Sequence, residues 1–157
     1  MEYRIKIKSP GSSDSFKKSL RDIEAGKAGL DKRRQKIVER LKSSGDYHKF
    51  EKNSIILRDL AYLSASEGVE FALFRSKDND ILIRGNTNSC NIIGELGEEI
   101  IKHKYEWVAH SHIDRGLLVP SEADRQTLKR LGQKKSKLIG INGEEIEFTS
   151  DIFDLTI

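Results

Sequence analysis

The stretch EWVAHSHIDRGLLVPSEADRQTL, residues 106–128, joins a predicted strand to a predicted helix and carries two of the chain's four histidines. Because side chains alternate along a strand, His110 and His112 should lie on the same side and could bind one ion. Ser121 precedes the helix, and Asp124 falls in its first turn, where a carboxylate could face back toward the histidines. The stretch therefore predicts a strand–loop–helix unit with a candidate metal site at its bend.

The segments around this stretch extend it into an α/β pattern. We predict the following elements: a helix over 54–66, a hairpin over 69–85, a helix over 91–104, a strand over 105–110, a helix over 121–132 and a closing hairpin over 136–150 that turns at Asn142-Gly143. Helices and strands that alternate in this way predict an α/β domain, with a mixed sheet flanked by helices.

The first 50 residues are predicted to form an extension to this domain, which would span residues 51–157. The extension should begin with a short strand over 3–7, where apolar and polar residues alternate. It continues over 14–43 as a charged helical segment with a thin apolar stripe, and two glycines weaken its middle. This N-terminal helix is a candidate for contacts with protein partners.

The charge of the chain favours no particular class of partner. Charged residues make up 34% of the sequence, yet the formal net charge is only +3. The basic run KRRQK at 32–36 could belong to a nucleic-acid-binding arm, but its acidic neighbours Asp31 and Glu39 favour an ordinary solvated helix. We therefore expect no nucleic acid partner.

The sequence also bears on the cellular compartment. Cys90 is the only cysteine, so an internal disulfide is excluded. The opening residues MEYRIKIKSPG carry charges where a signal peptide needs an apolar run, and no apolar stretch reaches 18 residues. We expect a cytoplasmic protein with no membrane partner, although export as part of a larger system stays open.

A buried acid is predicted in the segment GVEFALF, residues 68–74. Glu70 shares one strand face with Ala72 and Phe74, and the other face is also apolar. A carboxylate in such a strand is costly unless something pairs with it, which marks Glu70 as a candidate functional residue. Glu67 is the alternative, but it lies at a helix end, where an exposed acid needs no explanation.

Ser121 and Asp124 also have a purely structural interpretation. Their spacing is that of a capping box, in which the serine accepts from the third helical amide and the acid reaches back to the serine amide. A capping role and a role in a site do not exclude each other. The remaining histidines, His48 and His103, lie in charged surroundings and are expected at the surface.

Taken together, Glu70, the His110-Ser111-His112 triplet and the Ser121-x-x-Asp124 run resemble the signature of the JAMM or MPN+ (JAB) metalloprotease family, Glu…His-Ser/Thr-His-x7-Ser-x2-Asp. The resemblance covers roughly residues 52–149 of the chain. The segment LGQKKSKLIGINGEEIEF after the motif is similar to the closing helix and hairpin of bacterial and phage-associated members, including JAB domains of polymorphic toxin systems. The resemblance to this family implies a cytidine-deaminase-like α/β fold.

The sequence departs from the family pattern at two places. Ile113 stands where members usually have proline, and eight residues rather than seven separate His112 from Ser121. One extra residue in a surface loop has a small entropic cost, so the ligand geometry can survive it.

The resemblance implies a Zn²⁺ ion held by His110, His112 and Asp124, with the fourth position open for water. Glu70 would take a proton from that water and pass it to the leaving amine, and Ser121 would donate to the developing oxyanion. The implied function is zinc-dependent hydrolysis of a peptide or isopeptide bond in a protein or peptide substrate. Two alternatives are a non-catalytic MPN-like interaction module, and a toxin- or phage-associated domain that acts on another substrate.

Overall fold

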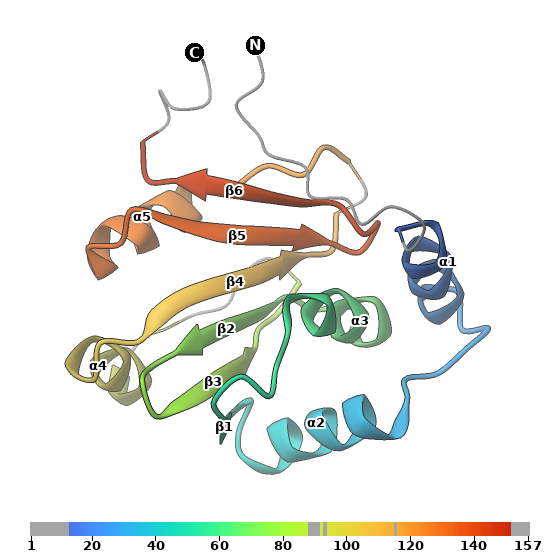
Figure 1. Cartoon of the computed structure of the whole chain (residues 1–157), viewed down its shortest axis with the longest axis horizontal. Helices are drawn as coiled ribbons and strands as arrows, with labels where there is room; N and C mark the ends of the chain where they lie inside the picture. The colour runs from blue at the N-terminus through green and yellow to red at the C-terminus, as the bar shows by residue number, and fades with distance from the viewer. Residues whose placement is uncertain (1–12, 88–91, 93, 115, 152–157) are drawn as a thin grey trace.

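Six strands form one mixed sheet in the computed structural model, which describes residues 13–87, 92, 94–114 and 116–151. Their order across the sheet is β1-β3-β2-β4-β5-β6 (Figure 1). Only the β4–β5 pair is parallel, and the other neighbouring pairs are antiparallel. The strands are β1 (Tyr47–Glu51), β2 (Phe71–Arg75), β3 (Asn79–Arg84), β4 (Glu106–His112), β5 (Lys135–Gly140) and β6 (Glu145–Thr149).

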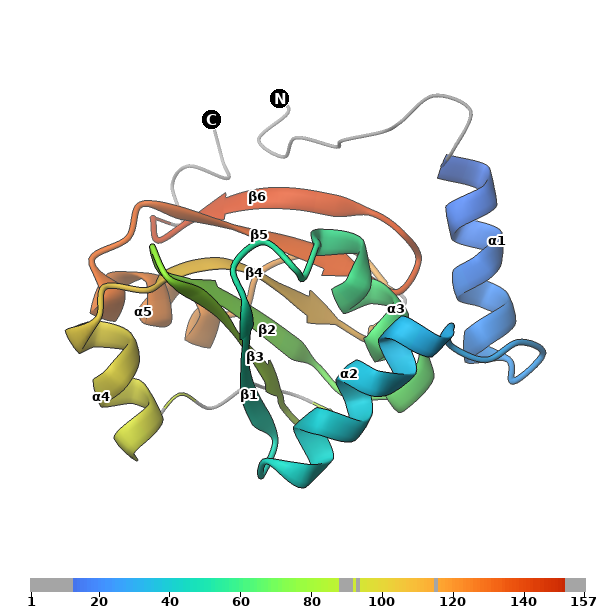
Figure 2. The ribbon, with the colours of Figure 1, turned by 60° about the horizontal axis from the view of Figure 1, so that its bottom comes forward.

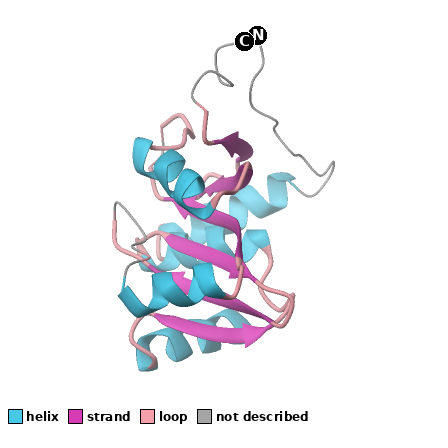
Figure 3. Cartoon of the chain, turned by 90° about the vertical axis from the view of Figure 1, so that its left-hand side faces the viewer, coloured by secondary structure: helices cyan, strands magenta, loops and turns pink. Residues whose placement is uncertain are grey.

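Helices cover both faces of this sheet (Figure 3). The helices found among the described residues are α1 (Ser13–Glu24), α2 (Lys32–Ser43), α3 (Leu57–Glu67), α4 (Gly94–Lys102) and α5 (Glu122–Leu131). The first three pack against one face of the sheet, and α4 and α5 pack against the other. None of these helices is long and apolar enough to cross a membrane.

This arrangement confirms the predicted α/β class. From α3 onward the order is helix, two strands, helix, strand, helix and two strands, as the sequence pattern predicts. The turn at Asn142-Gly143 also lies where it was expected, between β5 and β6, and Gly143 has the positive φ of 87° that the turn requires. The predicted strand over 3–7 and Cys90 lie outside the described residues.

The N-terminal region differs from the prediction in two ways. The helical segment predicted over 14–43 is divided into α1 and α2, because Gly26 adopts a φ of 77° and Asp31 starts a second helix as its N-cap. The sequence pattern also missed β1, which pairs along its whole length with β3. The sheet thus crosses residue 50, the predicted domain boundary, although that division itself stays a prediction.

The basic run at 32–36 is tied to α3 by a buried carboxylate. Arg33 donates to the two oxygens of Asp59 at 2.8 and 2.6 Å, and Arg34 donates at 2.8 Å. Burial would by itself raise the pKa of Asp59, but hydrogen bonds from Arg33 and the Ile56 amide hold that pKa below its usual value. Two cations of the run therefore connect α2 to α3, and α2 also contacts β1, the strand that follows it (Figure 2).

Candidate metal centre

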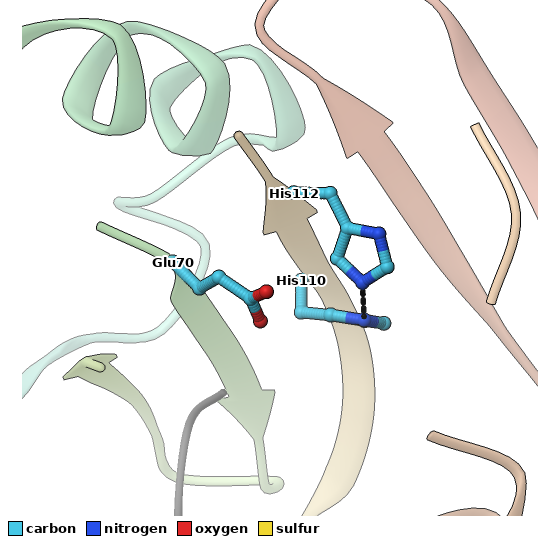
Figure 4. Close-up of side chains that lie close together, drawn as sticks. All are labelled: Glu70, His110 and His112. Carbon is cyan, nitrogen blue, oxygen red and sulfur yellow. Dashed lines mark hydrogen bonds between the residues drawn. The ribbon is translucent and has the colours of Figure 1, made fainter. Parts of the chain in front are cut away.

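The two histidines of β4 lie side by side at the end of a central strand. β4 is flanked by β2 and β5, and the His110 and His112 Nε2 atoms are 3.2 Å apart (Figure 4). The side chain of His110 is only 2% exposed, and that of His112 is 13% exposed. The strand alternation therefore has the predicted effect, and both imidazoles turn their Nε2 atoms to one point.

A β-bulge packs aromatic rings around His110. Val108 has no partner on β2, because the register passes from Leu73↔Ala109 to Phe74↔Trp107. Trp107 consequently faces the same side of the sheet as His110, with ring centroids 4.7 Å apart and an interplanar angle of 28°. Phe148 of β6 contacts His110 edge-on at 5.6 Å. This packing holds the imidazole in one orientation.

Asp124 completes a group of three converging ligand atoms. It lies in the first turn of α5, and its Oδ2 is 3.0 Å from His110 Nε2 and 3.2 Å from His112 Nε2. The same oxygen accepts a 2.8 Å hydrogen bond from the Ser121 amide, and the Ser121 hydroxyl accepts from the Asp124 amide at 3.1 Å. Asp124 therefore caps α5 and faces the two histidines at the same time.

The three ligand atoms fit one face of a tetrahedral coordination shell. Their separations are 3.0, 3.2 and 3.2 Å. Zinc bonds of about 2.0–2.2 Å to nitrogen and oxygen would place tetrahedral ligand atoms about 3.3–3.6 Å apart, slightly farther than in the metal-free site. The set of two imidazoles and one carboxylate also matches the donors that zinc takes in catalytic sites, with a fourth position free. The residues therefore fit a divalent transition metal.

The charges at the site suit a cation. Burial alone would raise the pKa of Asp124, but hydrogen bonds with His110 and His112 outweigh it and hold that pKa far below the usual range. Burial lowers the pKa of His110, so its neutral, metal-binding form is favoured. Burial by itself would lower the pKa of His112. The hydrogen bond with Asp124 and the charge of Glu70 outweigh burial, so the pKa of His112 is raised. A metal ion would compete with this proton for His112.

Glu70 lies beside the histidines, just before β2. One of its carboxylate oxygens and the ring nitrogens of His110 and His112 all lie within 4.8 Å of one another (Figure 4). The residue is 7% exposed. Burial raises the pKa of Glu70 to about 7, and the charge of Asp124 adds to this while that of His112 opposes it. These three residues form a buried group that could hold a metal ion.

The alternative acid, Glu67, has other partners. It forms ion pairs with Lys42 at 3.3 Å and Arg84 at 3.4 Å. These contacts tie the end of α3 to α2 and β3. Of the two acids considered from the sequence, Glu70 is the one whose carboxylate belongs to the group around the histidines.

Ser121 stands exposed at the start of α5, next to the ligand atoms. Its hydroxyl oxygen accepts the Asp124 amide hydrogen bond, so the hydroxyl hydrogen can still be donated to another group. His103 is exposed, and His48 bonds Ser44 at 2.8 Å and contacts Phe50 in β1. Neither histidine belongs to the group of converging ligand atoms.

Sequence reasoning missed the residues that support the ligands. Trp107 and Phe148 were not expected beside His110, because a bulge and a contact between β4 and β6 bring them there. Ser64 on α3 was likewise missed, although it is buried next to Ser111.

No protein-family model, curated protein or solved structure matches the chain. The resemblance to the JAMM family therefore rests on the sequence motif alone.

Proposed function

We propose that the protein is a JAMM-type metallopeptidase that uses Zn²⁺ to hydrolyse a peptide or isopeptide bond. The observation that carries the proposal is the convergence of ligand atoms of His110, His112 and Asp124 to within 3.2 Å of one another, with the Glu70 carboxylate beside them. The finer fold assignment, a cytidine-deaminase-like JAB/MPN domain, belongs to the same proposal. It is supported by the mixed sheet and by the end of β4 that carries the site.

In this proposal His110, His112 and Asp124 hold the metal. When bound, zinc supplies a Lewis acid that lowers the pKa of water and polarises the scissile carbonyl. Burial of His110 and the capping box of Asp124 fix these ligands before a metal arrives.

Glu70 is the general base and acid in this mechanism. Its pKa of about 7 lets the carboxylate accept a proton from the attacking water near neutral pH and return it to the leaving amine. Ser121 donates its free hydroxyl hydrogen to the oxyanion that develops on the carbonyl. Its exposure leaves it open to a substrate.

Metal analysis is the experiment that tests this function first. Protein purified after expression with added zinc should contain about one zinc ion per chain, and His110→Ala/His112→Ala should contain almost none. His48→Ala/His103→Ala is the matched control, because it also removes two histidines but leaves the site intact. Wild-type protein without zinc under these conditions would exclude the proposed mechanism, and a zinc-binding chain that cleaves no peptide or isopeptide would point to an interaction module.

A further inference from the structure

Two buried hydroxyls join the segment around Glu70, just before β2, to the strand of the histidines. Ser111 lies between the two histidines of β4, and Ser64 lies on α3; both are at most 1% exposed. Their Oγ atoms are 2.6 Å apart. The Phe71 amide donates to Ser111 Oγ at 2.9 Å, and Ser64 Oγ donates to the Val69 carbonyl at 2.7 Å.

The hydrogen bonds in this arrangement can be donated in one direction only. Each serine has a single hydroxyl hydrogen, and that of Ser64 is used on the Val69 carbonyl. The short contact between the hydroxyls therefore requires Ser111 to donate to Ser64, in preference to the Phe71 carbonyl 3.4 Å away. The result is a continuous chain from the Phe71 amide through Ser111 and Ser64 to the Val69 carbonyl.

This chain begins and ends on the two peptide groups that flank the Cα atom of Glu70. The other two polar groups of these peptides are bonded as well. The Glu70 amide donates to the Asn86 carbonyl at 2.8 Å, and the Gly85 amide donates to the Glu70 carbonyl at 2.7 Å. The backbone of Glu70 is thus held from two sides, by the segment after β3 and by the two serines.

Next to Glu70, the hydrogen bonds of Ser64 and Ser111 take the place of main-chain pairing between β2 and β4. The Cα pairing of β2 with β4 ends at Ala72↔His110, one residue short of Ser111 and Phe71. The Ser111 side chain reaches the Phe71 amide in place of a main-chain group. It is therefore a direct link between the residue that follows Glu70 and the residue between the metal ligands.

We propose that Ser64 and Ser111 are positioning residues, which set the distance of the Glu70 carboxylate from the metal held by the histidines. The proposal rests on the proposed function only in giving Glu70 a role next to a bound metal. Ser111→Ala leaves the buried Phe71 amide without its acceptor, so the Glu70 backbone can shift while the histidines keep their places.

A double-mutant cycle on zinc affinity tests this without any substrate. Zinc dissociation constants would be measured by competition with a chromophoric chelator for wild type, Glu70→Gln, Ser111→Ala and the double variant. Glu70→Gln removes a carboxylate that lies beside the metal ligands, and in the wild-type background it should weaken zinc binding about tenfold. In the Ser111→Ala background, where Glu70 is already displaced, the same change should have an effect of only about twofold.

Two further variants separate positioning from a general loss of packing. Ser111→Thr keeps the hydroxyl and should restore the full effect of Glu70→Gln. Ser136→Ala removes another buried serine, whose Oγ donates to the Trp107 carbonyl at 2.8 Å without touching the Glu70 segment. The effects of Ser136→Ala and Glu70→Gln should simply add.

Amide hydrogen exchange of Phe71 covers the case in which wild type binds no zinc. Exchange at Phe71 should be at least tenfold faster in Ser111→Ala and in Ser64→Ala than in wild type, while Leu73 in the ladder should change little. Equal effects of Glu70→Gln on zinc affinity in the two serine backgrounds, including no effect in either, would overturn the positioning role. Unchanged protection of Phe71 in Ser111→Ala would overturn the hydrogen-bond chain itself.

Discussion

Ser121 and Asp124 are joined by both hydrogen bonds of a capping box, and the carboxylate oxygen that closes the box is the oxygen that faces His110 and His112. The start of α5 therefore fixes the position of a carboxylate that we propose as a metal ligand. Folding of the helix and formation of the site depend on the same two hydrogen bonds.

Asp124→Asn should separate these two roles. The asparagine oxygen can still accept from the Ser121 amide, so in the presence of chelator at pH 8 the free energy of unfolding should fall by only about 1 kcal/mol. Zinc should raise the melting temperature of wild type far more than that of the variant, because the variant lacks the charged ligand.

Glu122→Gln is the matched control for this change. It removes a carboxylate from the same helical turn, but Glu122 accepts a 3.4 Å hydrogen bond from Gln126 and, within the described part of the chain, has no contact with the histidines. It should respond to zinc as wild type does. Equal stabilisation of Asp124→Asn and wild type by zinc would show that Asp124 is a cap only.

Glu70→Gln should keep stoichiometric zinc and lose catalysis. Glutamine cannot carry the proton, so hydrolysis should fall by about two orders of magnitude or more. Turnover would be measured on a peptide or ε-isopeptide substrate that wild type cleaves. Glu67→Gln should retain activity, because Glu67 is occupied by Lys42 and Arg84; the opposite ranking of the two variants would assign the base to Glu67.

The stability of the metal-free protein should depend on the ionisation of Glu70. Its pKa is about 7 in the folded protein, against an ordinary value of 4.5. The folded state therefore binds this proton more tightly, and the stabilisation is complete below about pH 4.5 and lost as the pH rises to about 7. Each pH unit between the two pKa values is worth about 1.4 kcal/mol, so the full effect is about 3–4 kcal/mol at most.

Urea unfolding of wild type and Glu70→Gln, both with chelator, measures this effect. Glutamine is neutral at every pH, so the stability of the variant relative to wild type should rise between pH 5 and pH 8. A constant difference between the two proteins over this range would mean that Glu70 is not buried as a proton-binding carboxyl.

Asp59→Asn should be the most damaging of these substitutions for folding. Asp59 is fully buried and accepts hydrogen bonds from Arg33, Arg34 and the Ile56 amide. Loss of its charge removes the ion-pair partner of Arg33 and leaves Arg34 with Asp31 alone, which should cost about 3 kcal/mol or more in denaturant unfolding. Asp31→Asn keeps an N-cap acceptor and loses only an exposed ion pair with Arg34, so it should cost less than about 1 kcal/mol; similar losses in both would show that the Asp59 network adds little.

The proximity of the candidate ligand residues could be predicted because their signal is local. His110 and His112 are two residues apart on a strand, and Ser121 and Asp124 have the spacing of a helix cap. Glu70 stood out because it is an acid between apolar residues on both faces of β2. In each case a short segment determines which way the side chain points.

The missed features depend on contacts between distant segments. β1 is an edge strand with no fully buried side chain, and its apolar residues Tyr47 and Phe50 fall on opposite faces, so no alternating pattern marks it. The bulge at Val108 exists only in the pairing of β4 with β2. Nothing in the sequence around Ser64 indicates that its hydroxyl will meet Ser111, which is 47 residues away.

The sheet order also has a consequence for synthesis on the ribosome. Glu70, the two histidines and Asp124 all precede β5, which pairs with β4 on the side away from β2. A nascent chain that ends before Lys135 would carry all four of these candidate site residues while one edge of β4 is still unpaired. An unpaired edge is a template for pairing with other chains, so this interval is the one in which a chaperone or early zinc capture would protect the chain most.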